Sequence, residues 1–120
     1  MPHLTLEYSD NLDGFDARAA VAAINQASVA SGLFGESDIK TRALRLDCWQ
    51  VGVESTPRAF AHVRIALLSG RTDEERKALA EAVLAALQPR VPALAGGEVQ
   101  LSVETVDLDR PSYAKAVRHG

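Results

Sequence analysis

Pro2 is a residue of this sequence that could act as a base for proton transfer. Removal of Met1 next to this small residue would leave proline as the N-terminus, with a free secondary amine. An ordinary α-amino group has a pKa of roughly 7.7–8.0, and burial or neighbouring cations lower it. A base that titrates near neutral pH suits proton transfer at carbon. The alternative interpretation is that Pro2 is simply a residue tolerated at the start of a strand.

Arg71 could bind an anion, because it lies just before an expected helix, in the segment Ser-Gly-Arg-Thr-Asp at residues 69–73. A guanidinium binds a carboxylate through two parallel hydrogen bonds, and the amides of a helix start also favour an anion. The alternatives are a solvated loop arginine, or one that is paired with Asp73 or Glu74.

Lys40 and Arg42 could bind a second carboxylate. They are two positions apart in an expected strand, so their side chains share one face. The alternative is that both belong to a solvated strand edge. The predicted site is therefore one base, Pro2, with Arg71, Lys40 and Arg42 as ligands of a small carboxylate substrate.

The other reactive residue types have structural interpretations. His3 and His62 have no metal-binding partner at ligand spacing, and we expect them to be satisfied structural histidines. Cys48 has no positioned base, so we expect it to pack rather than to react. As the single cysteine it allows neither an intrachain disulfide nor a zinc cluster, and we expect none of these residues to hold a metal. Trp49 could line an active-site pocket or pack in the core.

The residues that must position this site follow alternating and helical hydrophobic patterns. Residues 72 and 75 form a capping-box signature at the start of the second helix. The sequence predicts an α/β (α+β) fold of two consecutive β-α-β units, with a four-stranded sheet and two helices on one face. The expected elements are strands at 2–8, 39–47, 60–68 and 99–106 and helices at 17–31 and 73–88.

No segment rich in Gly, Ser or Pro separates the two units, so we expect one domain over residues 1–120, with halves of about 1–50 and 58–107. The strand at 60–68 is largely apolar on both sides, except at His62 and Arg64. An uncovered apolar sheet face usually marks an interface, so we expect a homo-oligomer. The tail at 107–120 could be an edge strand or an arm.

The composition limits the partners. The chain of 120 residues has 13 Lys and Arg against 16 Asp and Glu, a formal charge of −3. This gives no general attraction to nucleic acid or to an anionic membrane. No uncharged stretch is long and apolar enough to span a bilayer, and Glu7 and Asp10 interrupt the first apolar run, which argues against a secretory signal. We therefore expect a cytoplasmic protein.

Three segments resemble the 5-carboxymethyl-2-hydroxymuconate isomerase family of the tautomerase superfamily. They are PHLTLEYSDN at 2–11, DCWQ at 47–50, and AFAHV at 59–63 leading to GRT at 70–72. The resemblance implies a tautomerase-like fold, a homotrimer and chemistry without a cofactor. It also implies that Pro2 is the general base converting a dienol to its conjugated keto isomer in aromatic compound catabolism, with basic residues binding the carboxylates of a hydroxymuconate-type acid.

The second half of the chain also resembles the short 4-oxalocrotonate tautomerase, which allows the two halves to be overlaid. Ala61 then stands at the position of Pro2, about Leu12 at that of Arg71, and about Val99 at that of Lys40. Each half thus retains what the other has lost, which predicts one site per chain built from both halves. The family tends to have arginine where Lys40 stands, and Arg42 could substitute for it.

Two other functions fit the same elements. One is a different tautomerase, acting on an arylpyruvate or a haloacrylate. The other is a ferredoxin-like module that binds a small ligand without converting it. A free amine at Pro2 distinguishes them, because a binding module has no need of one.

Overall fold

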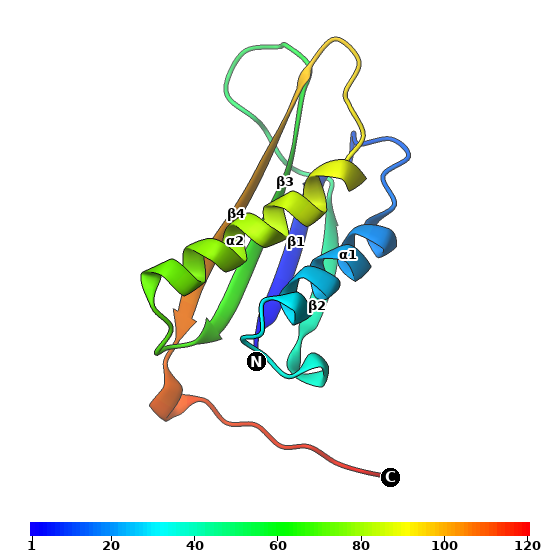
Figure 1. Cartoon of the computed structure of the whole chain (residues 1–120). Coiled ribbons are helices and arrows are strands. Elements are labelled where there is room, and N and C mark those ends of the chain that lie inside the picture. Colours follow the sequence, from blue (N-terminus) through cyan, green and yellow to red (C-terminus); the bar gives the residue numbers. More distant parts are fainter.

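The computed structural model describes residues 1–120 and contains the four strands and two α-helices in the predicted order (Figure 1). Each end lies within two residues of the prediction. Short 3₁₀ turns occupy Glu36–Asp38, Gln88–Arg90 and Arg110–Ser112. The main elements are β1 (His3–Ser9), α1 (Ala17–Ala30), β2 (Lys40–Leu46), β3 (Arg58–Leu68), α2 (Asp73–Leu87) and β4 (Glu98–Leu108).

The four strands form one sheet in the order β2-β1-β3-β4. Within each half the two strands are parallel, and the halves join through antiparallel pairing of β1 with β3. Both helices cover the same face of the sheet (Figure 1). The predicted fold of two β-α-β units is confirmed, and it leaves β2 and β4 as edge strands.

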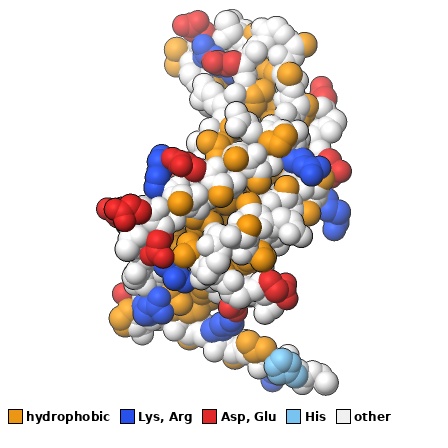
Figure 2. Space-filling view, in the orientation of Figure 1, with side chains coloured by type: hydrophobic (Ala, Val, Ile, Leu, Met, Phe, Trp, Pro, Cys, Tyr) orange, Lys and Arg blue, Asp and Glu red, His pale blue; other side chains and the backbone are white.

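The core lies between the sheet and the helices. Alternate residues of β1 and β3 point into it, because successive side chains of a strand face opposite sides. The helices close it with a stripe of apolar residues, and Figure 2 shows further hydrophobic side chains on the outer surface along and between them. The fully buried members include Leu4, Leu6, Ala20, Ile24, Ala61, Val63, Ile65, Leu67, Leu79, Val83 and Leu87.

Polar side chains define where both helices begin. The Asp16 carboxylate accepts a hydrogen bond from the backbone N–H of Ala19 at 3.0 Å. Thr72 and Glu75 form the predicted capping box, in which each side chain accepts a hydrogen bond from the other residue's backbone N–H. These caps satisfy N–H groups that a helix start leaves unpaired.

The uncovered face of the sheet is polar at its centre, not largely apolar as the sequence predicted. His62 contacts Ser102, with Nδ1 and Oγ 2.8 Å apart, and its Nε2 is bonded to Glu104. Arg64 also pairs with Glu104. The expectation considered β3 alone and missed the polar residues that the neighbouring strands place beside it, such as Glu7, which pairs with His62.

The last residues form an arm. β4 ends at Leu108, and after the turn at Arg110–Ser112 the chain runs beneath the end of the sheet that holds the N-terminus (Figure 1). Of the two interpretations of the tail, the arm is confirmed beyond Leu108. No helix of the chain has both the length and the apolar character needed to cross a membrane.

Candidate active site

Pro2 lies immediately before β1 and its side chain is fully buried. Its carbonyl oxygen accepts a hydrogen bond from the backbone N–H of Lys40 at 3.1 Å. Because β1 lies between β2 and β3, Pro2 has a neighbouring strand on either side. Met1 is bonded to its nitrogen and is half-buried.

Lys40 and Arg42 share one face of β2, as predicted, and it is the uncovered face of the sheet, because they pair with His3 and Thr5 of β1. The Lys40 ammonium donates a hydrogen bond to the carbonyl oxygen of Asp38 at 2.8 Å. Arg42 Nη2 donates to His3 Nδ1 at 2.8 Å. Lys40 is the nearer of the two to Pro2, since the backbone ladder joins them directly.

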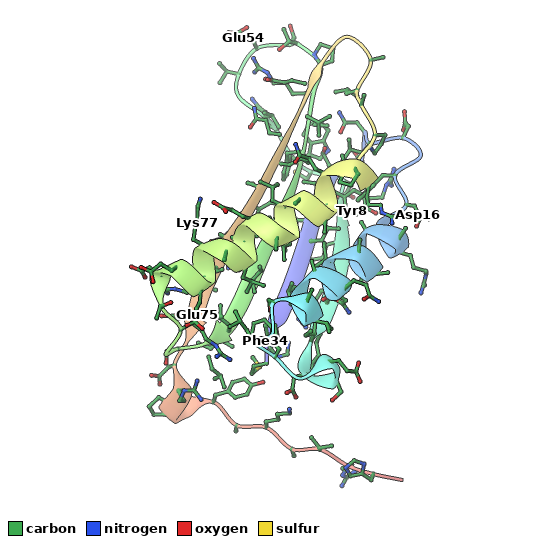
Figure 3. All side chains as sticks on the ribbon, in the orientation of Figure 1. Tyr8, Asp16, Phe34, Glu54, Glu75 and Lys77 are labelled. Carbon is green, nitrogen blue, oxygen red and sulfur yellow. The ribbon has the colours of Figure 1, made fainter.

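Arg71 reaches the same end of the sheet from the β3 side. Gly70 has φ of +118°, a conformation that side chains disfavour, and this turn separates β3 from α2. The Arg71 guanidinium then donates a hydrogen bond to the carbonyl oxygen of Leu33 at 2.7 Å and lies 5.7 Å from the ring centroid of Phe34. Figure 3 shows Phe34 at this lower end of the molecule.

Both alternative interpretations of Arg71 are wrong. It is half-buried rather than solvated, and it is not paired with Asp73, which binds Arg76 instead. Its hydrogen bond to Leu33 uses one N–H, and a guanidinium has five. Donors therefore remain for an anion.

The charges around the N-terminus favour an uncharged amine. Burial lowers the pKa of the Met1 amino group, and the nearby cations Lys40 and Lys115 lower it further, while Asp38 acts in the opposite direction. Burial together with Arg42 and Lys40 also lowers the pKa of His3. This end of the sheet is therefore an electropositive site that stabilises anions and disfavours additional positive charge.

Four residues at this end were not predicted from the sequence: Leu33, Phe34, Asp38 and Lys115. Leu33 and Phe34 lie in the loop after α1, where hydrophobic periodicity carries no information. Asp38 is two residues before Lys40, and a search for carboxylates beside the predicted cations would have found it. Nothing in the sequence indicates Lys115.

The structure corrects one equivalence between the halves. His3 pairs with Lys40, 37 positions later, whereas His62 pairs with Ser102, 40 positions later. With Ala61 standing for Pro2, the counterpart of Lys40 is therefore Ser102 and not Val99. Paired residues of β3 and β4 are three positions further apart in the sequence than those of β1 and β2, because the β3–β4 ladder is longer, and a fixed offset along the sequence cannot account for this.

The histidines and Trp49 have structural contacts. His62 is satisfied by Ser102 and Glu104. Trp49 donates a hydrogen bond to Asp10 at 2.8 Å and packs edge-on against Phe60, so it lies toward the opposite end of β1 from Pro2. The expectation that Cys48 packs inside is wrong, because the residue is exposed.

No group of three or more His, Cys, Asp or Glu side chains could hold a metal ion. The larger cavities also lie away from the predicted base. The largest, about 700 Å³, lies between α1 and α2 and is lined mainly by alanines. Pro2, Lys40 and Arg71 line none of these five cavities.

This sheet of two β-α-β units is the tautomerase-like α+β fold. The chain superimposes on a fused 4-OT with a TM-score of 0.75 at 19% identity, covering 95% of this chain and 91% of that one. A solved 5-carboxymethyl-2-hydroxymuconate isomerase from Deinococcus radiodurans R1 gives a TM-score of 0.88 at 31% identity, covering 98% and 90%.

Sequence similarity identifies the family within this fold. The 5-carboxymethyl-2-hydroxymuconate Delta-isomerase of Escherichia coli is 28% identical over 95 residues, which are 78% of this chain and 75% of that protein. The family model for 5-carboxymethyl-2-hydroxymuconate isomerase matches residues 2–118. The chain belongs to this family, and the prediction of an isomerase of the tautomerase superfamily is confirmed.

Proposed function

We propose that this isomerase converts a hydroxymuconate-type dienol to its conjugated keto isomer, with Pro2 as the general base and Arg71, Lys40 and Arg42 binding carboxylates. The observation that carries the proposal is the convergence of Pro2, Lys40 and Arg71 at one end of the sheet. These residues come from both halves of the chain. At the position equivalent to each of them, the other half has no such base or cation.

Removal of Met1 converts the Pro2 nitrogen from an amide into a secondary amine. The burial and the cations that lower the pKa of the Met1 amino group act on this amine as well. A lowered pKa increases the uncharged fraction of the amine at neutral pH, and this is the form able to accept a proton. The amine takes a proton from the dienol hydroxyl, and the resulting ammonium returns it to carbon, so the reaction begins and ends with a neutral base.

Arg71 and Lys40 flank the base on opposite sides, on the β3 side and the β2 side. Neighbouring strands lie about 4.8 Å apart, so β2 and β3 are separated by roughly 9.5 Å. Long basic side chains at the two ends of that span suit an acid with two carboxylates at opposite ends. Their charges also stabilise the dienolate that forms when the proton leaves.

A homotrimer would close the open end of the sheet around the site. The edge strands β2 and β4 each have one row of backbone groups that pairs with no other strand, which favours association between chains. The fused 4-OT with the same fold is a symmetric trimer. Light scattering at micromolar concentration should give about three times 12.8 kDa, and a clean monomer would contradict the assembly.

The remaining assignments follow from the same chemistry. We propose one domain over residues 1–120, since the halves of about 1–50 and 58–107 share one sheet. An exposed free thiol at Cys48 suits the reducing cytoplasm. Hydroxymuconate-type acids place the enzyme in the catabolism of aromatic compounds.

The test is a panel of dienols and enols followed by ultraviolet absorbance, including a hydroxymuconate diacid and an arylpyruvate. The diacid should be the best substrate. Pro2→Ala leaves a primary amine in nearly the same place, so activity should fall yet persist in part, within the ~10²–10⁴-fold that a general base contributes. Full activity of Pro2→Ala, or preference for the arylpyruvate, would contradict the assignment of base or substrate respectively.

A further inference from the structure

The C-terminal arm, residues 109–120, crosses the end of the sheet at which Pro2 lies (Figure 1). It touches the strands β3, β1 and β2 in turn, each at or next to the end nearest Pro2. The arm therefore runs across the base rather than away from it. Its three anchors are Arg110 on Ser69, Tyr113 on His3 and Lys115 on Asp38.

The first anchor holds the arm beside β3. Arg110 donates two hydrogen bonds to the carbonyl oxygen of Ser69, from Nε at 3.0 Å and from Nη2 at 2.9 Å. Ser69 in turn donates its backbone N–H to Leu108 at 3.0 Å. The start of the arm is thus joined to the turn that carries Arg71.

The second anchor joins the arm to β1. Tyr113 Oη lies 3.3 Å from His3 Nε2, while Arg42 donates to His3 Nδ1. A guanidinium can only donate, so Nδ1 is the acceptor and the neutral imidazole carries its proton on Nε2, directed at Tyr113. Burial, with the neighbouring cations Arg42 and Lys40, lowers the pKa of His3 and favours this neutral form.

The third anchor brings a lysine to the β2 side of the base. Lys115 Nζ lies 2.7 Å from Asp38 Oδ1, and Lys40 donates to the carbonyl oxygen of the same Asp38. An ammonium has three donors, so each lysine has two that these bonds leave unused. Asp38 thus holds two lysines beside one another.

We propose that the C-terminal arm is a wall of the catalytic site, and that Lys115 and Lys40 together bind the substrate carboxylate on the β2 side of Pro2. The inference rests on the proposed function for the position of the reacting carbon. It goes further in naming Lys115, which comes from outside both β-α-β halves.

The local charge balance supports this role. Lys40 and Lys115 carry positive charge beside a single carboxylate, Asp38, which also acts on the N-terminal amine. Asp38 raises the pKa of Lys115 and so keeps it protonated. With one carboxylate between two lysines, a second carboxylate is needed to neutralise them, and a dicarboxylate whose other end reaches Arg71 provides it.

The experiment measures binding by titration calorimetry on protein from which Met1 has been removed. The probes are adipate, a six-carbon dicarboxylate, and hexanoate, its monocarboxylate counterpart. The variants are Lys115→Gln, Lys115→Arg and the matched control Arg118→Gln, which removes one charge from the same exposed arm. The KM and kcat for the diacid dienol are measured in parallel.

Lys115→Gln should weaken adipate binding about tenfold or more, since a charge-assisted hydrogen bond is lost, and should change hexanoate binding less than twofold. Lys115→Arg should restore most of the adipate binding. In Lys115→Gln the KM for the diacid dienol should rise with little change in kcat. The inference is overturned if Lys115→Gln behaves like Arg118→Gln, or weakens both acids equally.

The two proposals can fail separately. If Lys115→Gln selectively loses adipate binding but the protein converts no dienol or enol, the role of Lys115 is supported and the proposed reaction is refuted. Turnover of the diacid with a KM that is unchanged in Lys115→Gln would support the reaction and overturn the role of Lys115.

Discussion

The backbone N–H of Lys40 and the carbonyl oxygen of Pro2 are joined by a hydrogen bond of 3.1 Å, so the parallel pairing of β1 and β2 continues to the first residues of both strands. The distance between the base and this cation is therefore set by the sheet. Changing the Lys40 side chain removes a charge without moving Pro2. This separation allows electrostatic effects on the base to be measured by substitution.

Asp38→Asn and Lys40→Gln should shift the pH profile in opposite directions. The Asp38 carboxylate raises the pKa of the N-terminal amine and Lys40 lowers it. If the uncharged amine is the base, as proposed, activity is lost as pH falls through its pKa. The acid limb of kcat/KM, which reports the free enzyme, should move to lower pH in Asp38→Asn and to higher pH in Lys40→Gln.

If the acid limb moved in the same direction in Asp38→Asn and in Lys40→Gln, this account of the amine would be contradicted. Lys40→Gln should also raise KM for a diacid, because it removes the ammonium group that is proposed to bind a substrate carboxylate. Arg42→Gln gives the comparison, since Arg42 is two ladder pairs further from Pro2 on the same face. Its effect on the acid limb should be the smaller of the two.

Arg71→Ala should lower kcat/KM by roughly one to two powers of ten, because a charge-assisted hydrogen bond contributes about 1.5–3 kcal/mol. Arg71→Lys should recover only part of this, since a point charge lacks the two-pronged geometry. The measurement is steady-state kinetics with the diacid.

The matched control for Arg71 is Arg76→Ala. Arg76 pairs with Asp73 and with Asp107 of β4, the edge strand that β3 separates from β1. Arg76→Ala should keep kcat/KM within about twofold of the wild-type value. Because Arg71 also binds the Leu33 carbonyl, thermal unfolding of both variants shows whether a loss of activity is a loss of folded protein. A fully active and stable Arg71→Ala would exclude Arg71 from substrate binding.

His62→Asn should leave both the rate and the pH profile nearly unchanged, since His62 bonds to Ser102 and Glu104 on the uncovered face, well away from Pro2. Steady-state kinetics between about pH 5 and 9 checks this. If His62→Asn were inactive while Arg71→Ala kept full activity, the site would be wrongly assigned.

Glu104→Gln should lower the free energy of unfolding at neutral pH. The hydrogen bond from His62, followed by the charge of Arg64, lowers the pKa of Glu104. A carboxyl group with a lowered folded-state pKa stabilises the protein above its unfolded pKa of about 4.3, and this contribution is lost as pH falls through the folded value. Urea titrations should therefore show a difference between variant and wild type at pH 7 that shrinks below about pH 4.

The order and limits of the strands and helices could be predicted because the signals are local. Alternation in residues 3–8 and the capping residues Thr72 and Glu75 depend only on near neighbours in the chain. Arg71 and Lys40 were placed in one site through the family resemblance and the division of residues between the halves. The structure brings both to the end of the sheet at Pro2.

The remaining features depend on contacts between distant residues. Ser102 replaces Val99 as the counterpart of Lys40 because the β3–β4 ladder is longer than the β1–β2 ladder, which changes the strand register. The polar centre of the uncovered face requires knowing which strands are neighbours. Lys115 lies 77 positions from Asp38 in an arm without hydrophobic periodicity, so no sequence pattern could have joined them.

The most direct test of the central claim compares two preparations of the same sequence, one retaining Met1 and one from which it has been removed, each verified by intact mass. They differ only in whether the Pro2 nitrogen is an amide or an amine. The processed protein should convert the diacid dienol, and the preparation with Met1 should show at most about 1% of that rate, as expected when a general base is lost. Equal rates in the two preparations would show that Pro2 is not the base.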